Sequence, residues 1–213
     1  MSFDAIAPWY RVLETIAFGN ALQQARVACL SELGSPRRAL IVGEGNGRFL
    51  AELLQCQRLV RIDCVDGSQR MLDLAQQHVL DANPEEISRV SFLRHDLRSW
   101  TPHDRYDLIV THFVLDCFRT QQVGNIVAKL AQAAAPHAIW LLADFTIPEA
   151  GFARWRARAW LAVMYSFFRW VAGIEAQRLV DPSPFLRAEG FPLEKEHQFR
   201  RGMVKSQLWR RTQ

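Results

Sequence analysis

A glycine-rich segment, Gly43 to Gly47, stands between a short apolar run and a helical pattern. Glycines at such a junction let the backbone turn tightly and approach a ligand closely. The first turn of the helix that follows offers unpaired N–H groups to a carboxylate or a phosphate. A tight strand-to-helix turn that binds nothing has the same pattern, so the loop alone leaves both interpretations open.

Two acidic residues follow the next two expected strands. Asp66 lies 19 residues after Gly47, where an acid in a nucleotide-binding α/β sheet accepts hydrogen bonds from ribose hydroxyls. Its alternative role is to cap the helix that begins near Ser68. Asp96 can accept from the exocyclic amine of adenine, or it is a solvated turn residue. Loop and acids together predict an adenosine-containing ligand.

Short apolar strands that alternate with helices position these residues. The expected strands are 39–43, 61–66, 90–94, 106–111, 138–144, 193–199 and 203–210. The expected helices are 3–33, divided at Gly19-Asn20, then 49–56, 69–80, 121–134, 151–171 and 183–189. This alternation predicts a mostly parallel sheet with helices on both faces. The last two strands are joined by a tight turn at Gly202 and must therefore be antiparallel.

Composition excludes several classes of protein. The length of 213 residues allows one or two domains, and one large domain is the simpler interpretation. A composition of 49% hydrophobic and 23% charged residues excludes global disorder. Four cysteines without a C-x-x-C pair argue against a disulfide scaffold and a zinc ribbon, and we expect a cytoplasmic protein without a metal centre. The N-terminus lacks the features of a signal peptide. The net charge of +4 is not concentrated in one run, so we expect no nucleic-acid partner.

Five ordered segments resemble the motifs of the class I S-adenosylmethionine-dependent methyltransferases. They are ALIVGEGNGRFL, DCVDGSQRML, VSFLRHDLRSW, YDLIVTHFVLDCF and AIWLLADF, and the resemblance extends from about Ala39 to the C-terminus. It implies an α/β, Rossmann-like fold with a seven-stranded, mostly parallel sheet, an antiparallel terminal strand and helices on both faces. The whole of 1–213 would form one such domain. S-adenosylmethionine would be the cofactor and S-adenosylhomocysteine its product.

The resemblance also implies residue roles. The expected cofactor contacts are Gly43, Glu44, Gly45 and Gly47 along the methionine and ribose, Asp66 at the ribose with Gly67, Ser68 and Met71 nearby, Asp96 and Leu97 around adenine, and Thr111 and His112 near the sulfonium. One position departs from the family, which carries an acid where this chain has Ile41, and Glu44 is the candidate replacement. Residues 1–35 are similar to the helical opening that folds over the cofactor in quinone and small-molecule methyltransferases, with Tyr10 as a candidate contact.

The candidates for a catalytic base are His112 and Asp116, which are four positions apart and would share one side of a helical turn. A histidine with a near-neutral pKa can take a proton from a phenol or an activated carbon acid. Alternatively, His112 only contacts the cofactor and Asp116 caps a helix or pairs with an arginine. Asp144 and Tyr165 rank below them as candidates for the base.

Residues 145–190 are the expected substrate-side cap. The candidate substrate contacts are Phe145, Trp160, Met164 and Tyr165. The aromatic helix within this cap is interpreted as a lid over an aromatic or lipid-like substrate, as an interfacial helix on anionic lipid, or as a core helix, with membrane contact the least favoured. The longest apolar stretch has ten residues, 159–168, which is too short to span a bilayer.

The predicted function is methyl transfer from S-adenosylmethionine to a small, apolar or aromatic molecule. Two alternatives stay open. A nicotinamide-dependent oxidoreductase also uses a glycine loop followed by an acid. A non-catalytic S-adenosylmethionine-binding module would keep the same pocket without turnover. The expected partner is a small-molecule substrate, and the sequence leaves the oligomeric state open.

Overall fold

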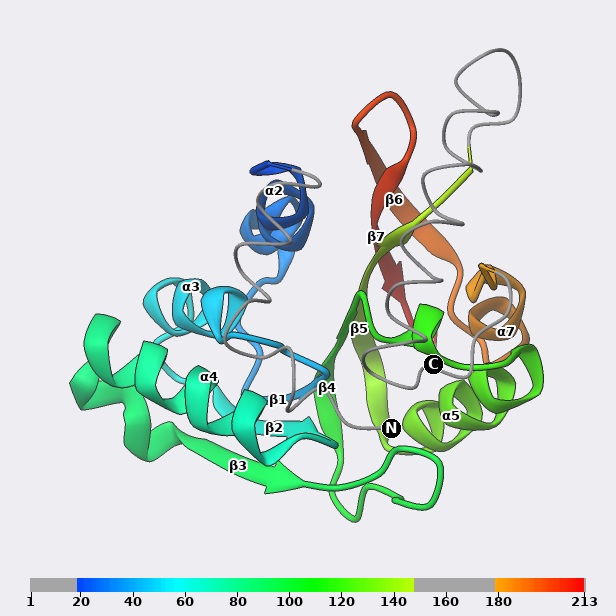
Figure 1. Ribbon diagram of the computed structural model, residues 1–213. Helices are drawn as coiled ribbons and strands as arrows, with labels where there is room; N and C mark the ends of the chain where they lie inside the picture. Colours follow the sequence, from blue (N-terminus) through cyan, green and yellow to red (C-terminus); the bar gives the residue numbers. More distant parts are fainter. Residues whose placement is uncertain (1–18, 148–178, 213) are drawn as a thin grey trace.

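The computed structural model describes residues 19–147 and 179–212. Within them, seven strands form one sheet in the order β3-β2-β1-β4-β5-β7-β6 (Figure 1). The strands are β1 (Arg38–Val42), β2 (Arg61–Asp66), β3 (Val90–Arg94), β4 (Tyr106–His112), β5 (Ala134–Phe145), β6 (Leu193–Phe199) and β7 (Val204–Arg210). The helices are α2 (Ala21–Val27), α3 (Arg48–Cys56), α4 (Gln69–Ala82), α5 (Thr120–Gln132) and α7 (Ser183–Ala188), with short 3-10 turns η1 (Leu30–Glu32), η2 (Pro84–Arg89) and η3 (Leu115–Cys117).

The sheet is parallel from β3 through β5, and β7 is antiparallel to both of its neighbours. The order of the strands reverses between β1 and β4, because β2 and β3 continue on one side of β1 and β4 and β5 on the other. In open α/β sheets, ligands bind outside the carboxyl ends of the strands at such a switch point. The predicted sheet, with its antiparallel terminal strand, is confirmed.

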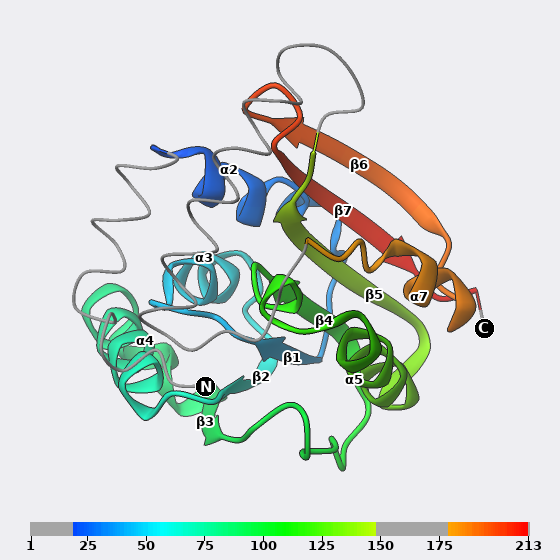
Figure 2. The same cartoon turned by 45° about the vertical axis from the view of Figure 1, so that its right-hand side comes forward.

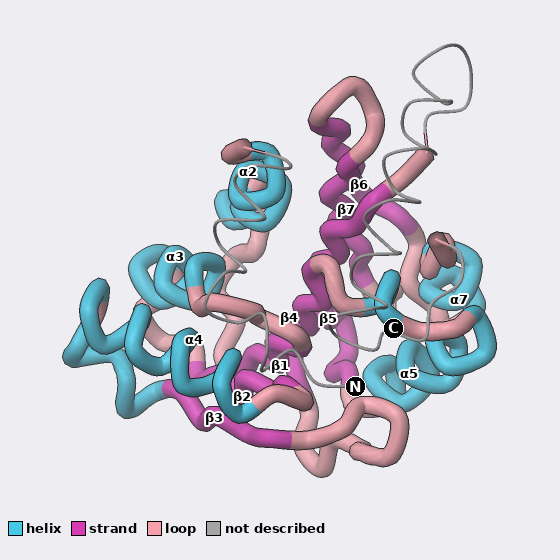
Figure 3. Tube along the Cα trace, viewed as in Figure 1, coloured by secondary structure: helices cyan, strands magenta, loops and turns pink. Residues whose placement is uncertain are grey.

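Helices cover both faces of the sheet. Figures 2 and 3 show α2, α3 and α4 on one face, and α5 and α7 on the other. The first face packs a cluster built around Phe49 and Leu53 of α3. The second packs Trp140, Trp209 and Phe191, whose side chains are fully buried. Burial on both sides is why β1 and β4 are nearly continuous runs of apolar residues.

The expected element boundaries agree with the structure within a few residues, with two differences. The helix expected up to residue 33 ends at Val27 as α2 and continues as the separate turn η1, before Gly34 adopts a φ of 66°. The helix expected up to residue 134 ends at Gln132, and β5 begins at Ala134 with an irregular stretch that contains His137 at a φ of 60°. Of the helices expected over 3–33 and 151–171, residues 3–18 and all of 151–171 lie outside the described residues.

No helix within 19–147 and 179–212 has the length and the apolar character needed to cross a bilayer.

Candidate active site

The glycine loop joins β1 to α3 in a conformation that only glycine adopts readily. Gly43, Gly45 and Gly47 have φ angles of 68°, 73° and 82°, in the left-handed region that disfavours side chains. A Cβ on Gly43 would lie 2.5 Å from the side chain of Val114, and one on Gly47 would lie 2.7 Å from the Cα of Ala75 in α4. The loop is therefore a tight turn that brings the backbone close to two neighbouring elements.

Glu44 is buried and caps α3. Its Oε1 accepts hydrogen bonds from the backbone N–H groups of Phe49 at 2.9 Å and Leu50 at 3.0 Å. The N-cap residue, Gly47, has no side chain that could do this. A carboxylate at this end also interacts favourably with the helix dipole. The expectation that this helix terminus offers its N–H groups to a ligand is therefore wrong for Phe49 and Leu50.

Asp66 lies at the carboxyl end of β2, beside the start of α4. Its Oδ1 accepts from the backbone N–H of Ser68 at 2.8 Å, and its carbonyl oxygen accepts from the N–H of His95 at 3.0 Å. The cap of α4 is Ser68, whose Oγ accepts from the N–H of Met71 at 3.2 Å. The alternative role of Asp66 as the helix cap therefore falls to Ser68. Gly67 stands between them, with a Cβ position 3.9 Å from the carbonyl oxygen of His95.

The loop after β3 is held from two directions. Both carboxylate oxygens of Asp96 contact the Arg98 guanidinium, which lowers the pKa of Asp96 to about 2. Lys129 of α5 donates from Nζ to the carbonyl oxygens of Leu97 at 2.8 Å, Arg98 at 3.0 Å and Trp100 at 2.9 Å. The sequence motif pointed to Asp96 and Leu97 but not to Arg98 or Lys129. Only the folded chain brings α5 to this loop, so no sequence signal pointed to Lys129.

We expect Lys129→Met to loosen this loop, because methionine keeps an apolar stem but cannot donate to three carbonyls. Hydrogen bonds from charged groups contribute about 1.5–3 kcal/mol each before solvent screening. Amide hydrogen exchange should rise at Ser99 and Trp100, whose N–H groups bond to Asp96. As a control, Lys195→Met removes an exposed ammonium on β6 and should leave these amides unchanged. Equal exchange in wild type and Lys129→Met would contradict the anchoring role.

The last residues of β4 point to opposite faces of the sheet. Thr111 is fully buried, and its Oγ1 accepts a 2.8 Å hydrogen bond from the indole N–H of Trp140. His112 packs edge-on against the ring of Phe49, with ring centroids 4.6 Å apart. Burial, followed by the Arg26 guanidinium, lowers the pKa of His112 well below its usual value. The imidazole is therefore neutral and a weak base.

The chain turns sharply after β4. Phe113 has a φ of 54°, which is strained for a residue with a Cβ. This turn carries Val114 to the glycine loop and leads into η3, which contains Asp116 and Cys117. Asp116 is buried, and its Oδ1 lies 3.7 Å from the Sγ of Cys117. His112 and Asp116 thus come from a strand and a separate turn, and not from one helical turn as expected.

Of the remaining predicted site residues, the structure describes Phe145 but not the other four. Phe145 is buried at the end of β5, and its ring lies 5.1 Å from that of Phe113. Tyr10, Trp160, Met164 and Tyr165 lie outside the described residues.

Among residues 19–147 and 179–212, one group of potential metal ligands lies near the end of α2. Cys29, Glu32 and His197 each place a ligand atom within 4.8 Å of the others. Glu32, however, pairs with Lys195 at 2.8 Å, and the Sγ of Cys29 lies 3.9 Å from Ser206. Since both side chains already have partners, we assign no metal to this group.

These loops lie within a segment that matches a known family. Residues 39–137 match the family described as a methyltransferase domain. Over these residues the chain is similar to a methyltransferase domain. The matched range runs from β1 to the irregular start of β5, so it includes the glycine loop, Asp66, Asp96 and η3. The family resemblance found in the sequence is confirmed.

Solved methyltransferase structures share the fold of this chain. The mitomycin 7-O-methyltransferase MmcR superposes with a TM-score of 0.71 at 22% identity, covering 99% of this chain and 61% of that one. An O-methyltransferase family protein from Burkholderia thailandensis gives 0.69 at 19% identity, covering 91% and 57%. The N-methyltransferase NodS from Bradyrhizobium japonicum, in complex with S-adenosylhomocysteine, gives 0.61 at 16% identity, covering 97% and 89%.

At these identities the superpositions establish the fold alone. The chain spans about three fifths of the length of the two O-methyltransferases. Comparison with curated protein sequences finds no match.

Proposed function

We propose that the protein transfers a methyl group from S-adenosylmethionine to a small, apolar or aromatic molecule. The matched family and the shared fold support the reaction class. The cofactor would supply an activated methyl group, and the protein would supply binding and orientation. Mitomycin 7-O-methyltransferase, one of the structural neighbours, acts on a small molecule by its name, which favours the same kind of acceptor here.

The observation that carries the choice of cofactor is the position of Glu44. A dinucleotide bound at a glycine loop places its pyrophosphate against the N-terminus of the following helix. In this chain the Glu44 carboxylate already accepts from Phe49 and Leu50 at that terminus. A phosphate there would meet a buried negative charge. S-adenosylmethionine carries a sulfonium and an amino group and no phosphate, so it fits this site and a nicotinamide dinucleotide does not.

The described residues fit the cofactor in the following way. The left-handed glycine loop would follow its methionine and ribose parts, and Asp66 would accept from the ribose hydroxyls. The loop at Asp96 and Leu97 would border adenine. Thr111 would contribute only its backbone, because its hydroxyl is engaged by Trp140. His112 would remain neutral beside the site, packed against Phe49.

We expect calorimetry to show micromolar binding of S-adenosylhomocysteine to the wild-type protein, and no binding of NAD or NADP. Asp66→Ala removes a carboxylate acceptor, and a hydrogen bond to a charged group is worth about 1.5–3 kcal/mol, or roughly 10- to 100-fold in affinity. The matched control, Asp73→Asn, alters an exposed carboxylate on α4 and should bind normally.

Two outcomes would reject the proposal, and a third would reassign one contact. Binding of NAD without binding of S-adenosylhomocysteine would indicate a nicotinamide-dependent oxidoreductase instead of a methyltransferase. Tight S-adenosylhomocysteine binding that Asp66→Ala leaves intact would move the ribose contact to another residue. A non-catalytic binding module would instead bind S-adenosylhomocysteine normally. It would form no S-adenosylhomocysteine when supplied with S-adenosylmethionine and phenolic acceptors.

A further inference from the structure

Two buried carboxyl groups lie at the ends of β4 and β5. Asp144 is 1% exposed and stands one residue before the end of β5. Asp116 is 4% exposed and lies in η3, shortly after β4. The two segments are joined where the N–H of Phe113 donates to the carbonyl oxygen of Ala143 at 2.8 Å. Both carboxyls therefore lie at the edge of the sheet where parallel strands present ligand sites.

One oxygen of Asp144 is unsatisfied. Its Oδ1 accepts from the backbone N–H of Phe145 at 2.8 Å. Its Oδ2 is buried and has no hydrogen-bond partner among residues 19–147 and 179–212. Buried polar atoms are almost always paired, because leaving one without a partner is costly. An orphaned oxygen at a ligand-binding edge indicates that a bound molecule supplies the missing donor.

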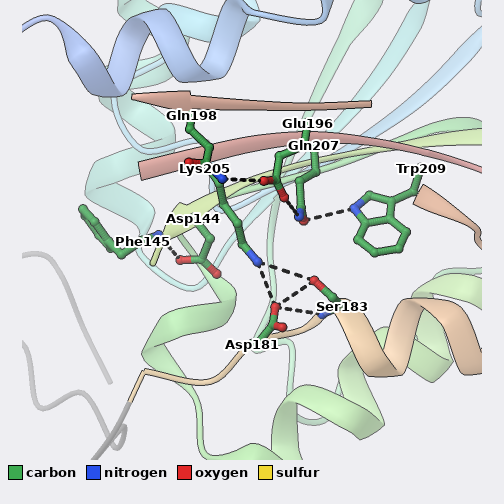
Figure 4. Close-up of polar contacts among 9 residues, drawn as sticks. All are labelled: Asp144, Phe145, Asp181, Ser183, Glu196, Gln198, Lys205, Gln207 and Trp209. Carbon is green, nitrogen blue, oxygen red and sulfur yellow. Dashed lines mark hydrogen bonds and ion pairs between the residues drawn. The ribbon is translucent and has the colours of Figure 1, made fainter. Parts of the chain in front are cut away.

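A lysine lies beside Asp144 but bonds elsewhere. Lys205 of β7 is directly opposite Asp144 in the antiparallel register, so the two side chains share a face. Its Nζ nevertheless donates to Asp181 at 2.8 Å and lies 3.4 Å from the Oγ of Ser183 (Figure 4). The Lys205 ammonium therefore bonds to Asp181 and does not donate a hydrogen bond to Asp144.

The charges around Asp144 favour a bound proton. Burial, followed by the Asp116 carboxylate, raises the pKa of Asp144 well above its usual value. Within the described residues, the other groups that face it are Cys117 of η3, Lys205 of β7 and Asp181 before α7. Burial, and then Asp116 and Asp144, likewise raise the pKa of the Cys117 thiol. Asp144, with the negative charge of Asp116 nearby, therefore holds a proton more readily than an isolated buried carboxyl would.

The pair stands next to the proposed cofactor site. Val114, which leads into η3, lies so close to Gly43 that a Cβ on that glycine would be 2.5 Å from the valine side chain. The glycine loop follows β1, Asp66 ends β2 and Asp96 follows β3. On the other side of the switch point, Asp116 follows β4 in η3 and Asp144 lies in β5. The carboxyl pair thus lies at the carboxyl edge of β4 and β5, next to the half of this edge that the proposed cofactor would occupy. We expect the methyl acceptor to bind at the carboxyl pair.

We propose that Asp144, with Asp116 beside it, receives the proton of the methyl acceptor, and that the acceptor presents a hydroxyl group to Oδ2. This inference rests on the proposed methyl transfer. The proton leaves the hydroxyl and forms an O–H bond at Asp144. The acceptor oxygen keeps the electron pair with which it takes the methyl group, and the pair of the broken carbon–sulfur bond stays on sulfur. Asp144 is then the catalytic residue and Asp116 the positioning residue that keeps its basicity high.

The first test uses the protein without cofactor or acceptor. Because the folded chain would hold a proton at Asp144 that the unfolded chain releases, wild-type stability should fall as the pH rises above the usual aspartate range. Asp144→Asn removes this proton uptake. Its urea midpoint should therefore rise relative to wild type as the pH increases above about 4, the usual aspartate range. Asp116→Asn should give a smaller rise in the same direction, and the exposed control Asp73→Asn none.

A midpoint difference between Asp144→Asn and wild type that does not change with pH would overturn the proposal, because Asp144 would then be ionised like an ordinary aspartate. This readout needs no ligand. It therefore separates failure of the carboxyl pair from failure of the proposed function, which the binding of S-adenosylhomocysteine reports.

The second test measures release of S-adenosylhomocysteine with phenols, catechols and anilines as acceptors. We expect turnover of hydroxyl compounds, and a loss of about 100-fold or more in kcat for Asp144→Asn, the usual size of general-base catalysis. Asp144→Asn should bind S-adenosylhomocysteine like wild type, and the acidic limb of the pH profile should disappear. Turnover of anilines alone, or of none of these compounds, would overturn the assignment of a hydroxyl acceptor.

Discussion

Gly47→Ala should destabilise the protein by about 2–5 kcal/mol, from left-handed backbone strain and from overpacking together. Gly47 has a φ of 82°, and its missing Cβ would lie 2.7 Å from the Cα of Ala75 and 2.8 Å from its carbonyl oxygen. Those atoms are helix backbone and cannot rotate away. The substitution must therefore push α3 and α4 apart at the turn that forms the proposed cofactor site.

The chain offers a matched control for this substitution. Gly190 has nearly the same φ, 81°, but nothing lies within 4 Å of its Cβ position. Gly190→Ala should therefore cost only the dihedral strain, about 1–2 kcal/mol. Urea unfolding of both variants separates the two contributions, and calorimetry should show that only Gly47→Ala loses S-adenosylhomocysteine binding. Equal losses of stability would mean that α4 does not approach the loop as closely as described.

Trp140→Ala should cost about 3–5 kcal/mol, the usual range for removing a buried large aromatic side chain. Trp140 is fully buried at the centre of β5, and its ring meets Phe191 edge-on at 5.5 Å. Its indole N–H donates to Thr111 of β4 at 2.8 Å. The residue thus fills the core and also ties together the two strands whose ends carry Asp116 and Asp144.

Conservative variants divide these two contributions. Trp140→Phe keeps most of the ring but leaves the buried Thr111 oxygen without its indole donor, which should cost about 1–3 kcal/mol. Thr111→Val removes the acceptor, and the double variant completes a thermodynamic cycle. We expect the double variant to be more stable than the sum of the single changes predicts. Strict additivity would show that the hydrogen bond contributes nothing to stability.

The ends of the strands and the resemblance to methyltransferases could be predicted, because the sequence patterns that indicate them are short and local. The run at 39–43, the glycines at 43–47 and the acid at 66 are encoded in successive short segments, and apolar alternation determines which segments become strands. Gly202 between two alternating segments required an antiparallel pair, and β6 and β7 form it. Short-range sequence patterns therefore sufficed for the sheet, its terminal strand and the methyltransferase domain.

Side-chain partners were not predictable, because they depend on contacts between distant segments. Glu44 was expected to contact the ligand, yet its Oε1 serves the N-terminus of α3, because Gly47 supplies no cap. Lys129 reaches the loop after β3 only because α5 packs beside it. Asp144 followed His112 and Asp116 as a candidate, although it is the carboxyl with an orphaned oxygen.

The sequence by itself determined where strands end and which residue types stand there. Only the tertiary structure decided which of those residues are buried, charged or already bonded. His112 shows the difference, since its type suggests a base, but burial against Phe49 and the nearby Arg26 keep it neutral. The physical reason is that basicity depends on solvation and on neighbouring charges. Both are properties of the packed molecule and not of the residue type.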